Sequence, residues 1–172
     1  MFEKAVRIIL KWESGYSNDP NDPGGETNFG ISKRSYPHID IKNLTEKDAL
    51  AIYRRDYWDT CLCDKLPMQI ALVVFDCAVN QGVVAAIKIL QECCGVPCDG
   101  LIGIRTLNAV ISKNTQQLVC DFNFMAARML RYAMNKNWNL YGKLDWYNFE
   151  NRVFIADPEN TGHENNVQIV PE

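Results

Sequence analysis

The chain has 172 residues, of which 47% are hydrophobic and 23% charged, and its formal net charge is −3. This composition is ordinary for a globular protein with one buried core. It argues against sequence-independent nucleic-acid binding, which needs clustered cations to displace counterions. The sequence also contains no uninterrupted apolar run of the roughly 18 residues that a membrane-spanning helix needs, so no membrane insertion is expected.

The N-terminal residues do not form the pattern of a secretory signal peptide. Glu3 comes early, Lys11 interrupts the apolar stretch, and no small-residue cleavage site follows. We therefore expect the protein to be made in the cytoplasm. The chain has seven cysteines, and an odd number without a secretion signal argues against a disulfide framework. The cysteine spacings match no paired zinc ligands, so neither a metal nor another cofactor is predicted.

Hydrophobic periodicity predicts an all-α fold, mainly helical, with a short turn or hairpin after the first helix. Residues 17–31 are dense in Asn, Asp, Pro and Gly, which favours turns and at most a short strand pair. Helices are expected over residues 2–13, from Thr45 to about Asp59, over 67–82, 83–94, 103–112, about 116–138 and about 145–155. Residues 157–172 are polar and aperiodic, which is typical of an extended tail.

Two local signals fix the middle of this pattern. The T-E-K-D segment at residues 45–48 resembles a capping box with Asp in the position usually held by Glu. Pro67 is well placed to start the segment that ends at Gly82, and this segment is apolar on nearly every side. We therefore expect residues 67–82 to form the central buried helix.

Glu13 is the residue whose position points most directly to chemistry. It lies at the C-terminal end of the first predicted helix, directly after Trp12. The helix dipole disfavours a negative charge at this end, and the neighbouring indole excludes water. Both effects raise the pKa of Glu13, which is the property that a glycosidase needs in its general acid. The alternative is a solvated residue at a helix end.

A second carboxylate, Asp22, follows nine residues later in a turn rich in Pro and Gly. Glycosidases use two carboxylates, separated by about 5–5.5 Å when one is a nucleophile and by about 6.5–9.5 Å when one activates water. Asp19 and Glu26 compete with Asp22 for this role. Each aspartate also has the alternative of closing an Asx-turn on its own backbone.

Several other polar and aromatic residues are candidates for the same site. Thr27 and Asn28 are short polar side chains that can hold a water molecule or a carboxylate, with turn capping as the alternative. Tyr16 and Phe29 flank the segment and are suited to stacking on sugar faces or to packing. Two further candidates are the amides at the end of the central helix, which need hydrogen-bond partners: Asn80 and Gln81. Trp58 is a candidate for a cleft wall, with packing into the core as the alternative.

The segment E-S-G-Y-S-N-D-P-N-D-P-G-G-E-T-N-F-G-I, residues 13–31, resembles a signature of glycoside hydrolase family 108. Further blocks match the family's patterns: L-T-E-K-D-A-L-A-I-Y-R-R-D-Y-W at 44–58, V-F-D-C-A-V-N-Q-G at 74–82 and D-G-L-I-G-I-R-T at 99–106. The resemblance spans about residues 2–155. Ser14 replaces the usual Gly, and D-W-Y-N-F-E-N-R-V at 145–153 departs from the family's G-W-x-x-R-V block.

The resemblance implies a lysozyme-like fold and an N-acetylmuramidase of phage or bacterial origin, an endolysin that degrades peptidoglycan, with Glu13 in the position of the catalytic glutamate. It implies a catalytic region over residues 1–92, a helical peptidoglycan-binding region over 93–156 and the polar tail over 157–172. Such a protein acts on the cell wall, so a holin or an export system would deliver it. A non-catalytic wall-binding protein, an indirect regulator of secretion and a lytic transglycosylase stay open as alternatives.

Overall fold

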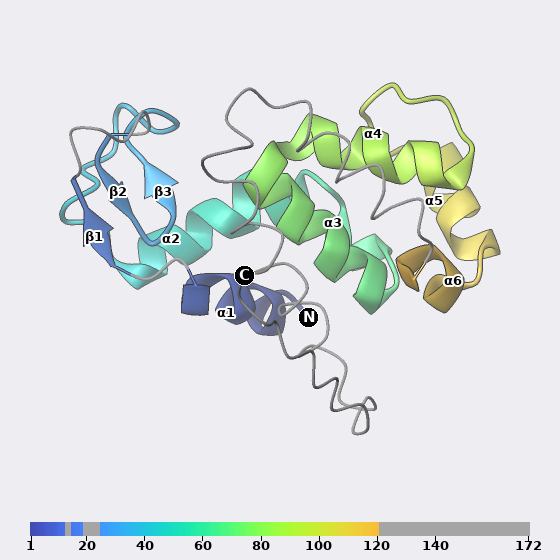
Figure 1. Cartoon of the computed structure of the whole chain (residues 1–172), viewed down its shortest axis with the longest axis horizontal. Coiled ribbons are helices and arrows are strands. Elements are labelled where there is room, and N and C mark those ends of the chain that lie inside the picture. The colour runs from blue at the N-terminus through green and yellow to red at the C-terminus, as the bar shows by residue number, and fades with distance from the viewer. Residues whose placement is uncertain (13–14, 19–24, 121–172) are drawn as a thin grey trace, which may run out of the picture.

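The computed structural model describes residues 1–12, 15–18 and 25–120. Within these residues the chain is mainly helical with one small sheet, which confirms the predicted fold class (Figure 1). The helices are α1 Phe2–Trp12, α2 Glu46–Ile52, η1 Tyr53–Asp59, η2 Cys63–Lys65, α3 Met68–Gln81, α4 Val83–Cys94, α5 Ile104–Ser112 and α6 Thr115–Cys120. The strands are β1 Tyr16–Ser17, β2 Thr27–Asn28 and β3 Ile31–Ser32.

The turn-rich segment folds into a three-stranded antiparallel sheet in the order β1-β2-β3. Asn28 pairs with Tyr16 on one side and with Ile31 on the other. Two residues, Phe29 and Gly30, connect β2 to β3, and their φ angles are 49° and 74°. Two positive φ values in a two-residue hairpin loop are the mark of a type I′ turn, which matches the natural twist of the strands. The sequence predicted a strand pair at most, and the structure has three strands.

The predicted helix from Thr45 to Asp59 is confirmed, but it has two parts. Thr45 accepts a hydrogen bond from the backbone N–H of Asp48, and the Asp48 carboxylate accepts one from the backbone N–H of Thr45, so the capping box is complete. The α-helical part ends at Ile52, and the chain continues without a break as the π-helix η1. π-helical turns are rare and cluster at functional sites.

Helix α3 is the central element of the helical part, as the sequence predicted (Figure 1). It begins after Pro67 and ends before Gly82, and it packs against α1, η1, η2, α4 and α6. Val110 of α5 and Leu118 of α6 belong to the same hydrophobic core as the α3 side chains. The predicted helices 83–94 and 103–112 are confirmed. Helix α6 is described as far as Cys120, so the remainder of the predicted helix 116–138, the predicted helix 145–155 and the tail lie outside the described residues.

The helical part is held together by an aromatic cluster. The rings of Phe2, Trp58 and Phe75 meet edge to face, with centroids 5.3 to 6.0 Å apart, and Tyr53 packs edge to face on Phe75 at 6.3 Å. Trp58 is fully buried. Large aromatic side chains contribute the most buried apolar area per residue, so this cluster carries much of the stability of the helical part.

Of the cysteines whose side chains the structure describes, Cys98 is exposed, and the buried ones are Cys61, Cys63, Cys77, Cys93 and Cys94. Burial and the neighbouring Cys61 thiol raise the pKa of Cys63 far above its usual range, with the hydrogen bond to Cys61 as the largest cause. No group of three or more His, Cys, Asp or Glu side chains within the described ranges is placed to hold a metal ion. No helix in the same ranges is long and apolar enough to span a membrane.

Candidate functional site

The predicted site residues fall into three places in the chain. Glu13 and Asp22 lie outside the described residues. A second group lies together on the small sheet and its turn: Tyr16, Thr27, Asn28 and Phe29. The remaining three belong to the helical part, with Asn80 and Gln81 at the C-terminal end of α3 and Trp58 in the core.

Tyr16 and Glu26 form a pair across the edge of the sheet. The Tyr16 hydroxyl donates a hydrogen bond of 2.7 Å to Glu26 Oε1, and the Tyr16 side chain is 43% exposed. This bond is the main reason why the pKa of Tyr16 is raised. The carboxylate of Glu26, a competitor for the second catalytic role, is therefore already engaged by a neighbouring phenol. The exposed face of the Tyr16 ring is still accessible for stacking.

Thr27 occupies the central strand and is half-buried. Its hydroxyl donates a hydrogen bond of 3.3 Å to the carbonyl of Gly25. Because this bond uses the hydroxyl proton, the lone pairs of Thr27 Oγ1 are free to accept a hydrogen bond from a water molecule. The strand pairings with Ser17 and Ser32 fix its backbone on both sides.

The side chain of Asn28 is held by contacts within the protein. It is only 7% exposed, and its Nδ2 donates to the carbonyls of Ile41 and Leu44 at 3.1 and 3.4 Å. Both donor hydrogens of the amide are therefore used to attach the 41–44 loop to the sheet. Turning this buried amide toward a ligand would cost the free energy of its hydrogen bonds to the two carbonyls.

Trp58 lies in the core. The sequence left core packing and a cleft wall as alternatives for this residue, and the side chain is 0% exposed and packs between Phe2 and Phe75. Its indole N–H donates to Asp64 Oδ1 at 2.9 Å, which satisfies its polar group at the edge of the core. This hydrogen bond is the main cause that lowers the pKa of Asp64. Trp58 therefore has no free surface with which to contact a sugar.

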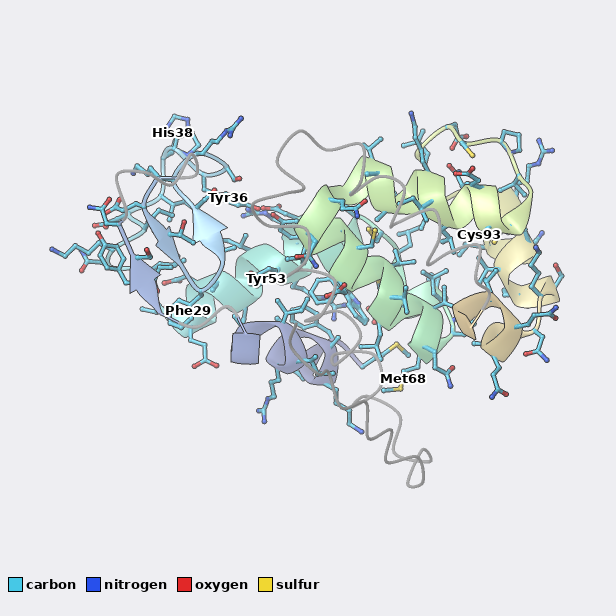
Figure 2. All side chains as sticks on the ribbon, in the orientation of Figure 1. Phe29, Tyr36, His38, Tyr53, Met68 and Cys93 are labelled. Carbon is cyan, nitrogen blue, oxygen red and sulfur yellow. The ribbon has the colours of Figure 1, made fainter. Side chains whose placement is uncertain are left out.

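Phe29 is held in an unusual backbone conformation at the tip of the β2–β3 turn. A bulky residue with a positive φ costs about 1–2 kcal/mol relative to its normal conformation. The Phe29 ring packs against the core, and its carbonyl accepts a hydrogen bond of 2.9 Å from the hydroxyl of Tyr53 on η1 (Figure 2). The turn is thus attached directly to the helical part.

Asn80 and Gln81 differ in their surroundings. Asn80 is exposed, and its Nδ2 donates to the carbonyl of Asp76 one turn earlier. Both polar atoms of the Gln81 side chain are buried, and within the described part of the chain neither has a hydrogen-bond partner. An unpaired buried amide costs on the order of 1–3 kcal/mol per missing partner, so it marks a place where a bound water or ligand group would stabilise the protein.

Sequence reasoning missed the residues through which η1 contacts the sheet region. The Tyr36 hydroxyl donates to Asp56 Oδ2 at 2.9 Å, and Asp56 also forms a bidentate pair with Arg55. Burial raises the pKa of Tyr36, and the neighbouring Tyr57 hydroxyl adds to this effect. In the sequence, the signal for these contacts was the I-Y-R-R-D-Y-W block. If this block is treated as a regular α-helix, its residues are assigned to the wrong faces of the helix.

Comparisons with known proteins give the family. The family model for glycosyl hydrolase 108 matches residues 6–82. The solved structure of Brucella abortus SagA is similar to this chain with 32% sequence identity and a TM-score of 0.79, over 88% of this chain and 90% of that chain. None of the curated proteins matches the sequence.

The chain belongs to the glycosyl hydrolase 108 family. This confirms the resemblance carried by the sequence motifs, and the mainly helical fold agrees with the lysozyme-like architecture that the resemblance implied. Family membership gives the chain a peptidoglycan-related, glycoside hydrolase-like fold. The family also indicates that the substrate is a glycan.

In this glycosyl hydrolase 108 chain, the part beyond Gly82 carries a second polar cluster at the predicted D-G-L-I-G turn. Gln91 is buried on α4; its Nε2 donates to Asp99 Oδ1 at 2.7 Å, and its Oε1 accepts from the backbone N–H of Gly100 at 2.9 Å. Gly100 has a φ of 80°, and a Cβ there would lie 3.0 Å from a Val84 methyl group. These contacts make the segment a tightly fixed turn and explain its residue types without a ligand.

Proposed function

We propose that the chain is a peptidoglycan hydrolase of the N-acetylmuramidase type. It cleaves the glycan between N-acetylmuramic acid and N-acetylglucosamine, with Glu13 as the general acid. The observation that carries this proposal is the family match over residues 6–82, because that match contains the whole segment from Glu13 to Ile31. No step requires a cofactor.

The position of Glu13 supports its role. Helix α1 is described as far as Trp12. The sequence predicts that this helix ends at Glu13, and at such an end the partial negative charge of the carbonyls favours a protonated carboxyl group. Glu13 donates its proton to the glycosidic oxygen as the bond to the anomeric carbon breaks. Water supplies the hydroxyl that ends on the anomeric carbon, and its other proton returns to the protein or solvent.

The remaining assignments of this proposal concern Asp22, the small sheet and the end of α3. Asp22 stabilises the oxocarbenium-like transition state or positions the attacking water, and Thr27 accepts a hydrogen bond from that water. Tyr16 and Phe29 offer aromatic surface to the sugar rings. Asn80 and Gln81 offer amides, and the unpaired amide of Gln81 supports a ligand or water at that position. In this proposal residues 1–92 form the catalytic region, and residues 93–156 bind the wall.

The experiment is clearance of purified Gram-negative peptidoglycan by the wild type, Glu13→Gln and Glu3→Gln. Loss of a general acid costs about 10²–10⁴ in rate, so Glu13→Gln should stop clearance. Glu3→Gln makes the same chemical change at an exposed position in the first turn of α1 and should leave clearance unchanged. Circular dichroism and wall pelleting check that all three proteins fold and bind.

Each alternative function has its own outcome. Clearance by Glu13→Gln at the wild-type rate would show that the acid lies elsewhere. Binding of the wall without clearance by any of the proteins would favour a non-catalytic wall-binding protein. The ends of the products separate the two chemistries, because a hydrolase leaves reducing ends whereas a lytic transglycosylase leaves 1,6-anhydromuramic ends.

A further inference from the structure

The sheet region, residues 15–18 and 25–44, contains few buried apolar side chains. Among its described residues these are Ile31, Ile41 and Leu44. Its strands are two residues long, and isolated strands of this size are not stable by themselves. These three side chains belong to the same hydrophobic core as the helical part. Because they are few, the position of the sheet also depends on specific polar contacts.

The contact at the tip of the sheet joins Tyr53 to Phe29. The Tyr53 side chain is 1% exposed and is fixed by ring contacts with Phe75 of α3 and Tyr57 of η1. Its hydroxyl is thus a fixed point at the surface of the helical core, and it donates a hydrogen bond of 2.9 Å to the Phe29 carbonyl. Figure 2 shows the two residues where the sheet meets the helical part.

The π-helical form of η1 explains why Tyr53 can serve this purpose. In a π-helix residues five apart lie above each other, because the hydrogen bonds run from i to i+5. Tyr53 and Trp58 are five apart, and both are fully buried. Asp56, between them, is left facing Tyr36 of the sheet region. A regular α-helix would place Tyr53 and Trp58 on different faces.

The Phe29 turn gives this hydrogen bond a direct connection to the proposed site. Phe29 is two residues from Thr27, and the pairing of β2 with β3 couples the turn rigidly to the strand that carries Thr27. Phe29 also has the positive φ that a bulky residue seldom adopts, so the turn needs an external contact to keep this conformation. The carbonyl that Tyr53 binds belongs to this same residue.

We propose that Tyr53 is a positioning residue: through the Phe29 carbonyl, its hydroxyl fixes the turn and therefore the place of Thr27 relative to the helical part. This inference rests on the proposed function for its effect on the reaction rate. Because the Tyr53 side chain is buried in the core, its loss should change turnover and leave substrate affinity nearly unchanged. A displacement of about 1 Å at a reacting group can cost up to a hundredfold in rate.

The test compares Tyr53→Phe with Tyr36→Phe. Each variant loses one hydroxyl that joins the sheet region to η1, but only the Tyr53 hydroxyl contacts the turn. With soluble, uncross-linked peptidoglycan glycan chains as substrate, Tyr53→Phe should lower kcat about tenfold and change KM less than about threefold. Tyr36→Phe should keep kcat within about twofold of the wild type.

Hydrogen exchange at the backbone amides of residues 28–31 provides a readout that does not need activity. Tyr53→Phe should speed exchange there, whereas Tyr36→Phe should not. An unchanged kcat in Tyr53→Phe, equal losses of kcat in both variants, or failure of Tyr53→Phe to fold would each overturn the inference. If the wild type cleaves no glycan, the proposed function fails separately. Faster exchange confined to Tyr53→Phe then supports the contact as a clamp on the turn, and unchanged exchange overturns it.

Discussion

The sheet region and the helical part of this protein are held by different forces. In the helical part, Phe2, Trp58 and Phe75 bury their rings against one another around α3. In the sheet region, the Asn28 amide holds the 41–44 segment to the strand, and the Tyr53 hydroxyl joins the β2–β3 turn to the helical part. Among the described residues of this region, only Ile31, Ile41 and Leu44 are buried in the common hydrophobic core. Burying an aromatic side chain contributes several kcal/mol, whereas one hydrogen bond contributes about 0.5–1.5 kcal/mol.

This difference shows that the stability of the fold and the exact placement of its side chains depend on different kinds of contact. Apolar packing is strong but not directional, so it keeps the helices together without fixing individual atoms. Hydrogen bonds contribute less stability, but they determine distances and angles. The sheet region carries Thr27, Tyr16 and Phe29 of the proposed site, and directional contacts supplement its few buried apolar side chains. Regions with few buried apolar contacts also open most easily, which is compatible with the polymer substrate of the proposed function.

The largest loss of stability is expected for Phe75→Ala, a change in the helical part. This change removes the ring shared by Phe2, Tyr53 and Trp58, and truncation of a buried Phe costs about 3–5 kcal/mol. Urea unfolding should show this loss in the global transition. Phe75→Leu conserves most of the volume and should cost less than about 1.5 kcal/mol. A loss below 1 kcal/mol for the alanine variant would mean that the aromatic cluster is not the main source of stability.

Asn28→Ala tests the sheet region and should have a smaller, local effect. Two buried carbonyls, those of Ile41 and Leu44, lose their amide donor, at a cost of about 1–3 kcal/mol. Amide hydrogen exchange should rise over residues 25–44, with little change in α3 and α4. The matched control is Asn43→Ala, since that amide bonds only to the exposed Asp40 and its loss should stay within about 0.5 kcal/mol. Equal exchange changes in both regions would contradict the distinction between them.

The smallest effect on stability is expected for Asp64→Asn. This change alters the carboxylate that accepts the hydrogen bond of the Trp58 indole at the edge of the helical core. The Trp58 indole N–H, followed by Arg54, holds the pKa of Asp64 below its usual value. A carboxylate with a lowered folded-state pKa stabilises the protein above its unfolded pKa of about 3.9, and this contribution is lost as the pH falls through the folded pKa. Urea unfolding at pH 7 and pH 3 should therefore show a stability difference between wild type and variant at pH 7 that shrinks at pH 3. A constant difference would show that the charge of Asp64 is irrelevant.

Much of the fold could be predicted because its signals are local. The capping box at Thr45 and the apolar run after Pro67 depend on neighbouring residues, and both predictions are confirmed. The π-helical form of η1 could not be predicted, because it satisfies long-range packing of Tyr53 and Trp58 rather than any local preference. The candidate site could be predicted in part: Tyr16, Thr27 and Phe29 do lie together, whereas Glu13 and Asp22 stay predictions.

Asn28 and Trp58 show why residue type alone left two roles open for each of these residues. A polar amide in a turn and a tryptophan after a helix are equally suited to binding a sugar or to completing the core. Only the distance to the Ile41 carbonyl and the complete burial of the indole distinguish these roles. Both facts depend on parts of the chain that are remote in sequence.

The sequence by itself determined the helical class, the order of the elements and the family, and it predicted the segment that we propose to carry the chemistry. These follow from periodicity, capping residues and short motifs, which act over a few positions along the chain. The tertiary structure alone decided which side chains are buried, which amides are already paired, and that Tyr53 reaches the Phe29 carbonyl from 24 residues away. Burial and hydrogen-bond partners are set when distant segments meet, so no local pattern can encode them.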